Sequence, residues 1–189
     1  MNYTIRILSL LSNVDRREHM EKVMKGVNLP YTFHNATTPD NITEKIQDRL
    51  FSEVDYYDWD INHKAVMATF MSHLSLLNFS YSNKQALLVL EDDLELSDKD
   101  FNLDTIDFSS FDIFNLGTEI SCYAYFVSWQ GAGKLLDIIR TQGIKKAYDW
   151  EMCQIGLENK IRYKTVPTPV WKQVESFTSN IAPNGYRRK

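Results

Sequence analysis

The sequence has few of the residues that form flexible loops, disulfides and histidine-rich metal sites. Its two cysteines, Cys122 and Cys153, have no metal-ligand spacing, and we expect reduced core thiols rather than a disulfide framework. Glycine and proline together number 12, about half of their usual share, so few long loops are expected. The four histidines are fewer than the ligands that two-metal phosphohydrolases usually add to their carboxylates.

Long hydrophobic runs are also missing. The apolar N-terminal segment is interrupted by Arg6 and Ser9 and has no small-residue cleavage site, so it predicts a first strand rather than a signal peptide. The longest stretch without Asp, Glu, Lys or Arg, residues 65–83, contains His73 and several Ser and Asn and is too polar for a bilayer core. These features predict a cytoplasmic protein.

The net charge of −4 conceals an uneven distribution, with −10 in residues 1–133 and +6 in residues 134–189. A nucleic-acid-binding motif with a basic stripe is absent, so we expect no nucleic-acid partner. A basic C-terminal part facing an acidic centre suits a metal and a phosphorylated small molecule. For any individual lysine, ordinary solvated surface charge is an equally good explanation.

Length and composition predict one folded domain over residues 1–189, because 43% of the residues are apolar and 24% are charged. Strand and helix patterns alternate along it. Strands are expected at residues 3–11, 31–34, 86–90, 111–116, 121–127 and 161–166, and helices at 14–25, 43–50, 62–81, 129–141 and from about 149. The first helix is expected to stop at Gly26. This alternation indicates an α/β fold with a mainly parallel central sheet flanked by helices.

Three successive carboxylates, Glu91, Asp92 and Asp93, follow the hydrocarbon strand 86–90 directly. Ligands of open α/β sheets bind beyond the carboxyl ends of the strands. Neighbouring carboxylates that lose hydration have raised pKa values unless a cation lies among them, and Mn²⁺ or Mg²⁺ accepts such oxygen ligands. Glu91 and Asp93 would face the same side if the chain stays extended. Taken alone, such a triplet is more often a solvated acidic turn or a helix N-terminus.

Further short motifs occur in a fixed order around this triplet. They are Asn13-x-Asp15-Arg16-Arg17, residues 31–36, Ser72-His73-Leu74, residues 88–93, Gly117-Thr118, residues 124–128 with Gly131-Ala132, Asp149 in YDWEM, and Pro169-Val170-x-x-Gln173 before Ser179. Together they resemble glycosyltransferase family 25, the lipooligosaccharide biosynthesis galactosyltransferases. The resemblance covers about residues 3–182 and leaves a basic tail at 183–189.

The resemblance implies a GT-A type fold with a Rossmann-like nucleotide-binding domain. It also implies inverting transfer of a hexose, typically galactose, from a UDP-sugar to a lipid-linked oligosaccharide. Mn²⁺ or Mg²⁺, held by Asp93, Glu91 and Gln173, would act as a Lewis acid on the departing UDP. No histidine follows His73, so Gln173, Ser179 or water would supply the late ligand. The donor-binding residues would be Leu10, Ser12, Arg16, Ser72, His73, Glu91 and Asp92.

Inversion in one displacement needs a base that takes the proton of the acceptor hydroxyl. Asp149, expected at a helix start, is the first candidate, and Glu151 and Glu119 are the alternatives. Helix capping explains Asp149 equally well. Arg16 has the alternative of a local salt bridge, and His73 that of a buried core histidine. The aromatic cluster Tyr56, Tyr57 and Trp59 suits sugar stacking or ordinary loop packing.

Two other functions fit the same residues: a metal-dependent phosphohydrolase, or a non-catalytic nucleotide- or glycan-binding module. The basic tail, residues 183–189, suits a peripheral contact with an anionic membrane, with a disordered tail as the alternative.

Overall fold

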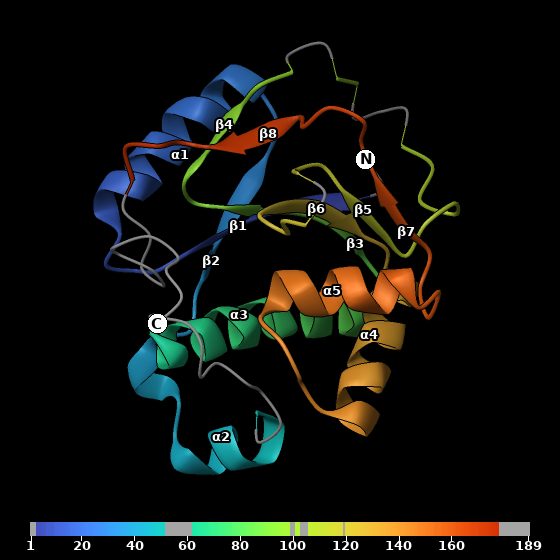
Figure 1. Ribbon diagram of the computed structural model, residues 1–189. Coiled ribbons are helices and arrows are strands. Elements are labelled where there is room, and N and C mark those ends of the chain that lie inside the picture. Colours follow the sequence, from blue (N-terminus) through green and yellow to red (C-terminus); the bar gives the residue numbers. More distant parts are fainter. Residues whose placement is uncertain (1–2, 52–61, 99–100, 103–105, 119, 178–189) are drawn as a thin grey trace.

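A six-stranded sheet forms the centre of the computed structural model, which describes residues 3–51, 62–98, 101–102, 106–118 and 120–177 (Figure 1). The strand order is β2-β1-β3-β6-β5-β7. β6 runs antiparallel to its neighbours β3 and β5, whereas the other pairs are parallel. The predicted α/β fold with a mainly parallel sheet is therefore confirmed, with β6 as the reversed strand.

Most of the elements lie where the sequence pattern places them. The strands of the central sheet are β1 (Tyr3–Ser9), β2 (Tyr31–Asn35), β3 (Ala86–Glu91), β5 (Ile113–Asn115), β6 (Ala124–Val127) and β7 (Tyr163–Thr165). The helices are α1 (Val14–Val27), the short 3-10 helix η1 (Pro39–Asn41), α2 (Glu44–Leu50), α3 (His63–Asn83), α4 (Trp129–Gln142) and α5 (Tyr148–Leu157).

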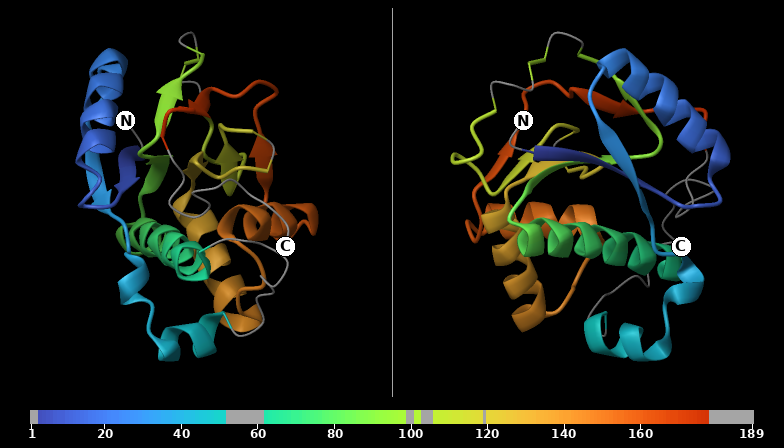
Figure 2. Two further views of the ribbon diagram at one scale, coloured as in Figure 1. Left: turned by 60° about the vertical axis from the view of Figure 1, so that its left-hand side comes forward. Right: turned by 180° about the vertical axis from the view of Figure 1, so that it is seen from behind.

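Both faces of the central sheet are covered. Helices α3, α4 and α5 pack on one face, and α1 with the small sheet of β4 and β8 packs on the other (Figures 1 and 2). In β3, Leu87 and Val89 point to the first layer, and Leu88 and Leu90 point to the second. A strand buried on both sides has no polar face, which explains its uninterrupted hydrocarbon sequence.

Local signals fix two helix starts, but one predicted helix end is wrong. The Asn62 side chain accepts a hydrogen bond from the backbone of α3, and the Ser128 side chain does the same for α4. Gly26, the predicted stop of the first helix, lies inside α1. The helix ends at Val27 and is capped by Asn28, whose φ of 55° is tolerated because a short amide side chain suits the left-handed region.

The second sheet has no counterpart in the sequence prediction. It consists of β4 (Leu94–Leu96) and β8 (Trp171–Gln173), which pair antiparallel with Leu94 opposite Gln173. This pairing carries the C-terminal part of the chain to the turn that follows β3. Across the described residues, every helix is too short or too polar to cross a bilayer.

Candidate active site

The predicted site lies where β1 and β3 end side by side. The two strands are parallel, and Leu8 stands opposite Glu91 in their register. β3 ends at Glu91, and Asp92 and Asp93 form a turn before β4 begins. The carboxylates are therefore at the carboxyl edge of the sheet, as predicted. Glu91 and Asp93 were expected to face the same side only if the chain stayed extended. The chain turns at Asp92 and Asp93, so this condition is not fulfilled.

Asp92 is held on all sides by protein groups. One oxygen accepts hydrogen bonds from Ser9 Oγ at 2.7 Å and Asn13 Nδ2 at 3.2 Å, and the other accepts from Arg16 at 3.0 Å. Asn13 is the N-cap residue of α1, but its side chain makes no cap bond. Asp92 thus ties the turn to the end of β1 and the start of α1.

Asp93 differs because only part of its carboxylate is satisfied. Oδ2 accepts a hydrogen bond from Arg16 at 3.1 Å, while Oδ1 is buried and has no hydrogen-bond partner among the described residues. Burial raises the pKa of Asp93, and Arg16 and the Gln173 side chain oppose that rise. An unpaired buried oxygen of this kind is costly, and a bound cation or ligand donor would relieve it.

Arg16 is the positive centre of the site. Its side chain is 12% exposed. It bridges the adjacent residues Asp92 and Asp93, which are distant from Arg16 in the sequence. The Phe177 ring covers the guanidinium, with 5.2 Å from Arg16 Cζ to the ring centroid. One guanidinium therefore serves two of the three carboxyl groups in the cluster.

The metal ligands suggested by the resemblance are only partly gathered. Gln173 on β8 lies beside Asp93, and Glu91 is close enough for the three carboxyl groups to repel one another. Within the described ranges, no three His, Cys, Asp or Glu side chains form a metal-ligand group. Asp93 Oδ1 fits Mn²⁺ or Mg²⁺ as one ligand, because these ions keep water and phosphate oxygens as their other ligands. The neighbouring Gln173 side chain would add a second ligand with its amide oxygen turned to the ion.

Glu91 faces the other side of the site, toward α3. Its Oε1 lies 3.4 Å from His73 Nε2, and its side chain is 25% exposed. Burial, reinforced by repulsion from Asp93 and Asp92, raises the pKa of Glu91 well above its usual range.

His73 is fully buried behind Glu91. Its ring stacks on the Tyr148 ring, with 4.1 Å between centroids and 6° between planes. Nδ1 lies 3.0 Å from the Tyr125 hydroxyl, which accepts a hydrogen bond from the Tyr148 hydroxyl. Burial lowers the pKa of His73 to about 4, even though Asp149 opposes this shift. The imidazole is therefore neutral at physiological pH. His73 is a buried, hydrogen-bonded core histidine, as the alternative prediction had it, and it also contacts Glu91 in the site.

Asp149 lies in the first turn of α5, near both Glu91 and His73. Burial, together with repulsion from Glu91, raises the pKa of Asp149 to about 7, although His73 and the Cys122 backbone lower it. A carboxylate with this pKa is well matched to proton abstraction near neutral pH.

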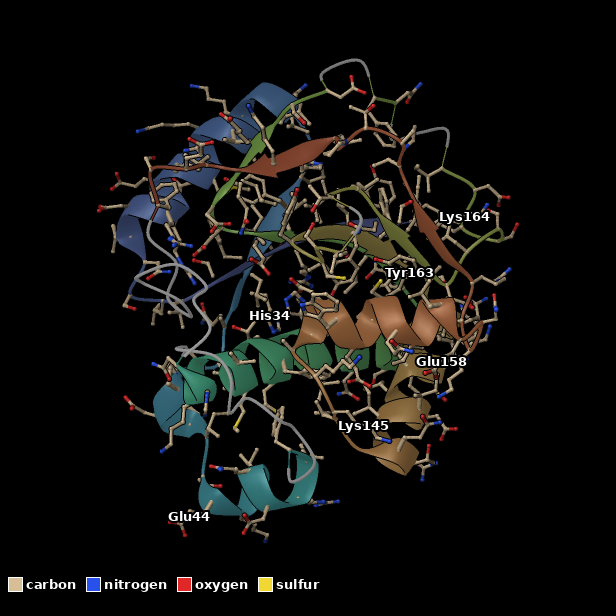
Figure 3. All side chains as sticks on the ribbon, in the orientation of Figure 1. His34, Glu44, Lys145, Glu158, Tyr163 and Lys164 are labelled. Carbon is tan, nitrogen blue, oxygen red and sulfur yellow. The ribbon has the colours of Figure 1, made fainter. Side chains whose placement is uncertain are left out.

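Glu151, the alternative base, serves a different purpose. It is buried, and its Oε2 accepts backbone hydrogen bonds from Lys145 at 3.1 Å and Lys146 at 2.9 Å. Figure 3 shows Lys145 in the connection between α4 and α5, away from the central sheet. Glu151 therefore fixes this connection. The remaining alternative, Glu119, lies outside the described residues.

The other predicted donor-side residues have varied places. The Ser72 hydroxyl donates a hydrogen bond to the Ala68 carbonyl and accepts one from the Thr37 backbone amide. It therefore anchors the segment that follows β2. Leu10, whose carbonyl accepts a hydrogen bond from Arg17, and the exposed Ser12 lie between β1 and α1. Ser179, the aromatic cluster of residues 56–59 and the basic tail lie outside the described residues.

Several residues of the site are not among the predicted site residues: Ser9, Asn13, Tyr125, Tyr148 and Phe177. Ser9 and Tyr148 each precede a predicted site residue in the sequence. The hydroxyl of Ser9 at the end of a strand, and the position of Tyr148 next to Asp149, were signals that could have identified them. Phe177 has no such signal, because it reaches Arg16 only through the pairing of β8 with β4.

Comparison with known proteins identifies one family. Residues 2–120 match the model of glycosyltransferase family 25, described as an LPS biosynthesis protein. The matched part includes Arg16, His73 and the carboxylate triplet, whereas Asp149 and Gln173 lie beyond it. No curated protein matches the sequence.

The chain is also similar to two solved glycosyltransferase structures. One is involved in the glycosylation of the major capsid of PBCV-1, with 14% identity, a TM-score of 0.49, and coverage of 88% of this chain and 82% of that chain. The other is GlyE of Streptococcus pneumoniae TIGR4, with 13% identity and a TM-score of 0.49. This alignment covers 88% of this chain but 45% of GlyE.

Proposed function

The chain belongs to glycosyltransferase family 25, and from this premise we propose that it is a metal-dependent, inverting hexosyltransferase. The proposed donor is a UDP-hexose, with galactose as the sugar, and the proposed acceptor is a lipooligosaccharide or another surface glycan. The observation that supports this function best is the buried, unpaired Asp93 Oδ1 beside Arg16 at the carboxyl edge of the sheet.

On the donor side, Asp93 and Gln173 would hold Mn²⁺ or Mg²⁺. When bound, the metal supplies Lewis-acid stabilisation of the negative charge on the departing diphosphate. Asp92 and its partners Ser9 and Asn13 fix the turn that carries Asp93. Arg16 keeps the Asp93 carboxylate oriented through Oδ2 and leaves Oδ1 for the ligand.

On the acceptor side, Asp149 would take the proton of the attacking hydroxyl. Its raised pKa, about 7, makes it a stronger base than an ordinary carboxylate and leaves much of it ionised near neutral pH. Glu151 is a poorer candidate because its Oε2 is engaged by two backbone amides.

Titration calorimetry with UDP, in Mn²⁺ and in EDTA, tests the donor side. We expect Mn²⁺ to tighten UDP binding about tenfold or more, and Asp93→Asn to abolish this gain because it removes the ligand charge. Asp137→Asn, which alters an exposed carboxylate on α4, is the matched control and should bind like the wild type. UDP binding that is indifferent to Mn²⁺ in the folded wild-type protein would contradict the proposal.

A panel of UDP-sugars, incubated with Mn²⁺ and assayed for UDP release, then tests the enzyme class. Preferential release from UDP-galactose supports the hexosyltransferase. Metal-dependent UDP binding without turnover of any sugar nucleotide would instead support a binding module.

A further inference from the structure

A continuous row of polar groups lies behind Glu91 in the otherwise apolar layer between α3, α5 and the sheet. It runs from the Tyr148 hydroxyl to the Tyr125 hydroxyl, then to the two ring nitrogens of His73 and finally to Glu91 Oε1. Tyr125, Tyr148 and His73 are all buried. Such groups each need a partner, so the direction of every hydrogen bond in the row is constrained.

The direction follows from counting hydrogens. Tyr148 donates to Tyr125, so the single hydroxyl hydrogen of Tyr125 is left for His73 Nδ1, 3.0 Å away. A neutral imidazole that accepts at Nδ1 carries its hydrogen on Nε2, and Nε2 faces Glu91 Oε1. The opposite tautomer would leave the Tyr125 hydrogen without an acceptor in this row.

We propose that His73 is a positioning residue, which holds the Glu91 carboxylate in the site by donating a hydrogen bond from Nε2. Without this donor, Glu91 would lose the hydrogen bond that directs it toward α3 and could turn to solvent, since its side chain is already 25% exposed. The stacked Tyr148 ring and the Tyr125 hydroxyl keep the imidazole from rotating. The contribution of this bond to turnover rests on the proposed function, whereas the bond itself does not.

The tautomer can be measured without any activity. Long-range proton–nitrogen NMR correlations of ¹⁵N-histidine-labelled protein, in EDTA at pH 7, distinguish the two neutral tautomers from imidazolium. The His73 signals are assigned by their loss in His73→Gln. We expect a neutral ring with the hydrogen on Nε2, and a neutral ring with its hydrogen on Nδ1 would overturn the proposal, because Nε2 would then have no hydrogen to donate to Glu91.

Two amide substitutions separate positioning from mere packing. The side-chain amide nitrogen of Gln reaches approximately the position of Nε2, whereas the side-chain amide oxygen of Asn, which can accept a hydrogen bond from Tyr125, reaches approximately the position of Nδ1. His73→Gln therefore keeps a donor for Glu91, while His73→Asn keeps only the link to Tyr125. For UDP-galactose turnover in Mn²⁺, we expect His73→Gln to be about tenfold more active than His73→Asn, which corresponds to the loss of one hydrogen bond.

Circular dichroism and thermal unfolding establish that both variants are folded. Equal activities in two folded variants, or a more active His73→Asn, would contradict the positioning role. If the wild type shows the expected tautomer but releases no UDP from any sugar nucleotide, the proposed function fails and the hydrogen bond to Glu91 stands.

Discussion

The carboxylates of the site differ because their surroundings differ. Asp92 has hydrogen-bond donors on both oxygens, Asp93 has donors on one side only, and Asp149 is part-buried near another negative charge. The first is suited to holding structure, the second to holding a ligand and the third to exchanging a proton. Division of labour among similar side chains by environment is a general feature of active sites.

Asp149→Asn tests the assignment of the base. We expect UDP-galactose turnover to fall about 100-fold or more, because an amide cannot accept the proton, while UDP affinity in Mn²⁺ stays within a factor of about two. In the wild type, turnover should rise with pH through about 7, where Asp149 loses its proton, and then level off. Turnover in Asp149→Asn close to that of the wild type would remove Asp149 from the role.

The same raised pKa predicts a cost in stability. The folded-state pKa of Asp149 lies above that of an unfolded Asp, so its contribution to stability is complete below about pH 4 and is lost as pH rises through about 7. In EDTA at pH 8, Asp149→Asn should therefore unfold a few degrees higher than the wild type, and the difference should vanish near pH 4. A less stable variant at pH 8 would show that Asp149 is favourably paired in the folded protein.

At this scale, sequence reasoning identified residue types but could not identify partners. Glu91, Asp93 and Arg16 were identifiable because they follow a strand end or begin a helix. The engagement of Glu151 with the backbone before α5, and of Ser72 with Thr37, depends on how the chain returns in space. No local pattern encodes these contacts.

Elements with long periodic or uninterrupted apolar patterns were predictable, whereas the two strands of the second sheet were not. α3 and β3 carry enough buried side chains to define their own pattern. β4 and β8 have three residues each and exist only through their mutual pairing. The reversed direction of β6 also leaves no trace in composition, because a buried strand is apolar in either direction.

Two helical glycines give a matched test of how an element is placed. A Cβ on Gly131 in α4 would come within 2.4 Å of the Asp112 carbonyl oxygen, whereas a Cβ on Gly26 in α1 meets nothing within 4 Å. Gly131→Ala should lower the free energy of unfolding by about 2 kcal/mol or more, since backbone must move. Gly26→Ala should raise it by about 0.5 kcal/mol through reduced chain entropy. Chemical denaturation measures both, and equal effects would refute the close approach of α4 to the sheet.

For the whole molecule, the site depends on segments from almost the entire described chain. Arg16 comes from α1, the triplet from the end of β3, Asp149 from α5 and Gln173 from β8. The order of the family motifs indicated that these residues belong together, but only the sheet order brings them to one edge. The acidic N-terminal part and the basic C-terminal part of the chain also form ion pairs with each other, at Asp112.

Asp112 joins three elements on the side of the sheet away from β1. It is fully buried before β5 and accepts hydrogen bonds from Lys134 Nζ of α4 at 2.8 Å, and from the Arg162 backbone at 2.8 Å and guanidinium at 3.0 Å before β7. Burial alone would raise the pKa of Asp112, but these donors outweigh it and lower the pKa to about 2.

Because the folded-state pKa of Asp112 is depressed, its contribution to stability is present above about pH 4 and is lost as pH falls toward about 2. Asp112→Asn should lower the free energy of unfolding by about 2 kcal/mol at pH 7, since a charged acceptor with several donors is replaced by an amide. Denaturant titrations at pH 7 and pH 2.5 should show this difference shrinking at the lower pH. The exposed Asp137→Asn should change stability by less than about 0.5 kcal/mol at either pH. A difference for Asp112→Asn that stays constant between the two pH values would mean that packing, rather than the carboxylate charge, holds β5, β7 and α4 together.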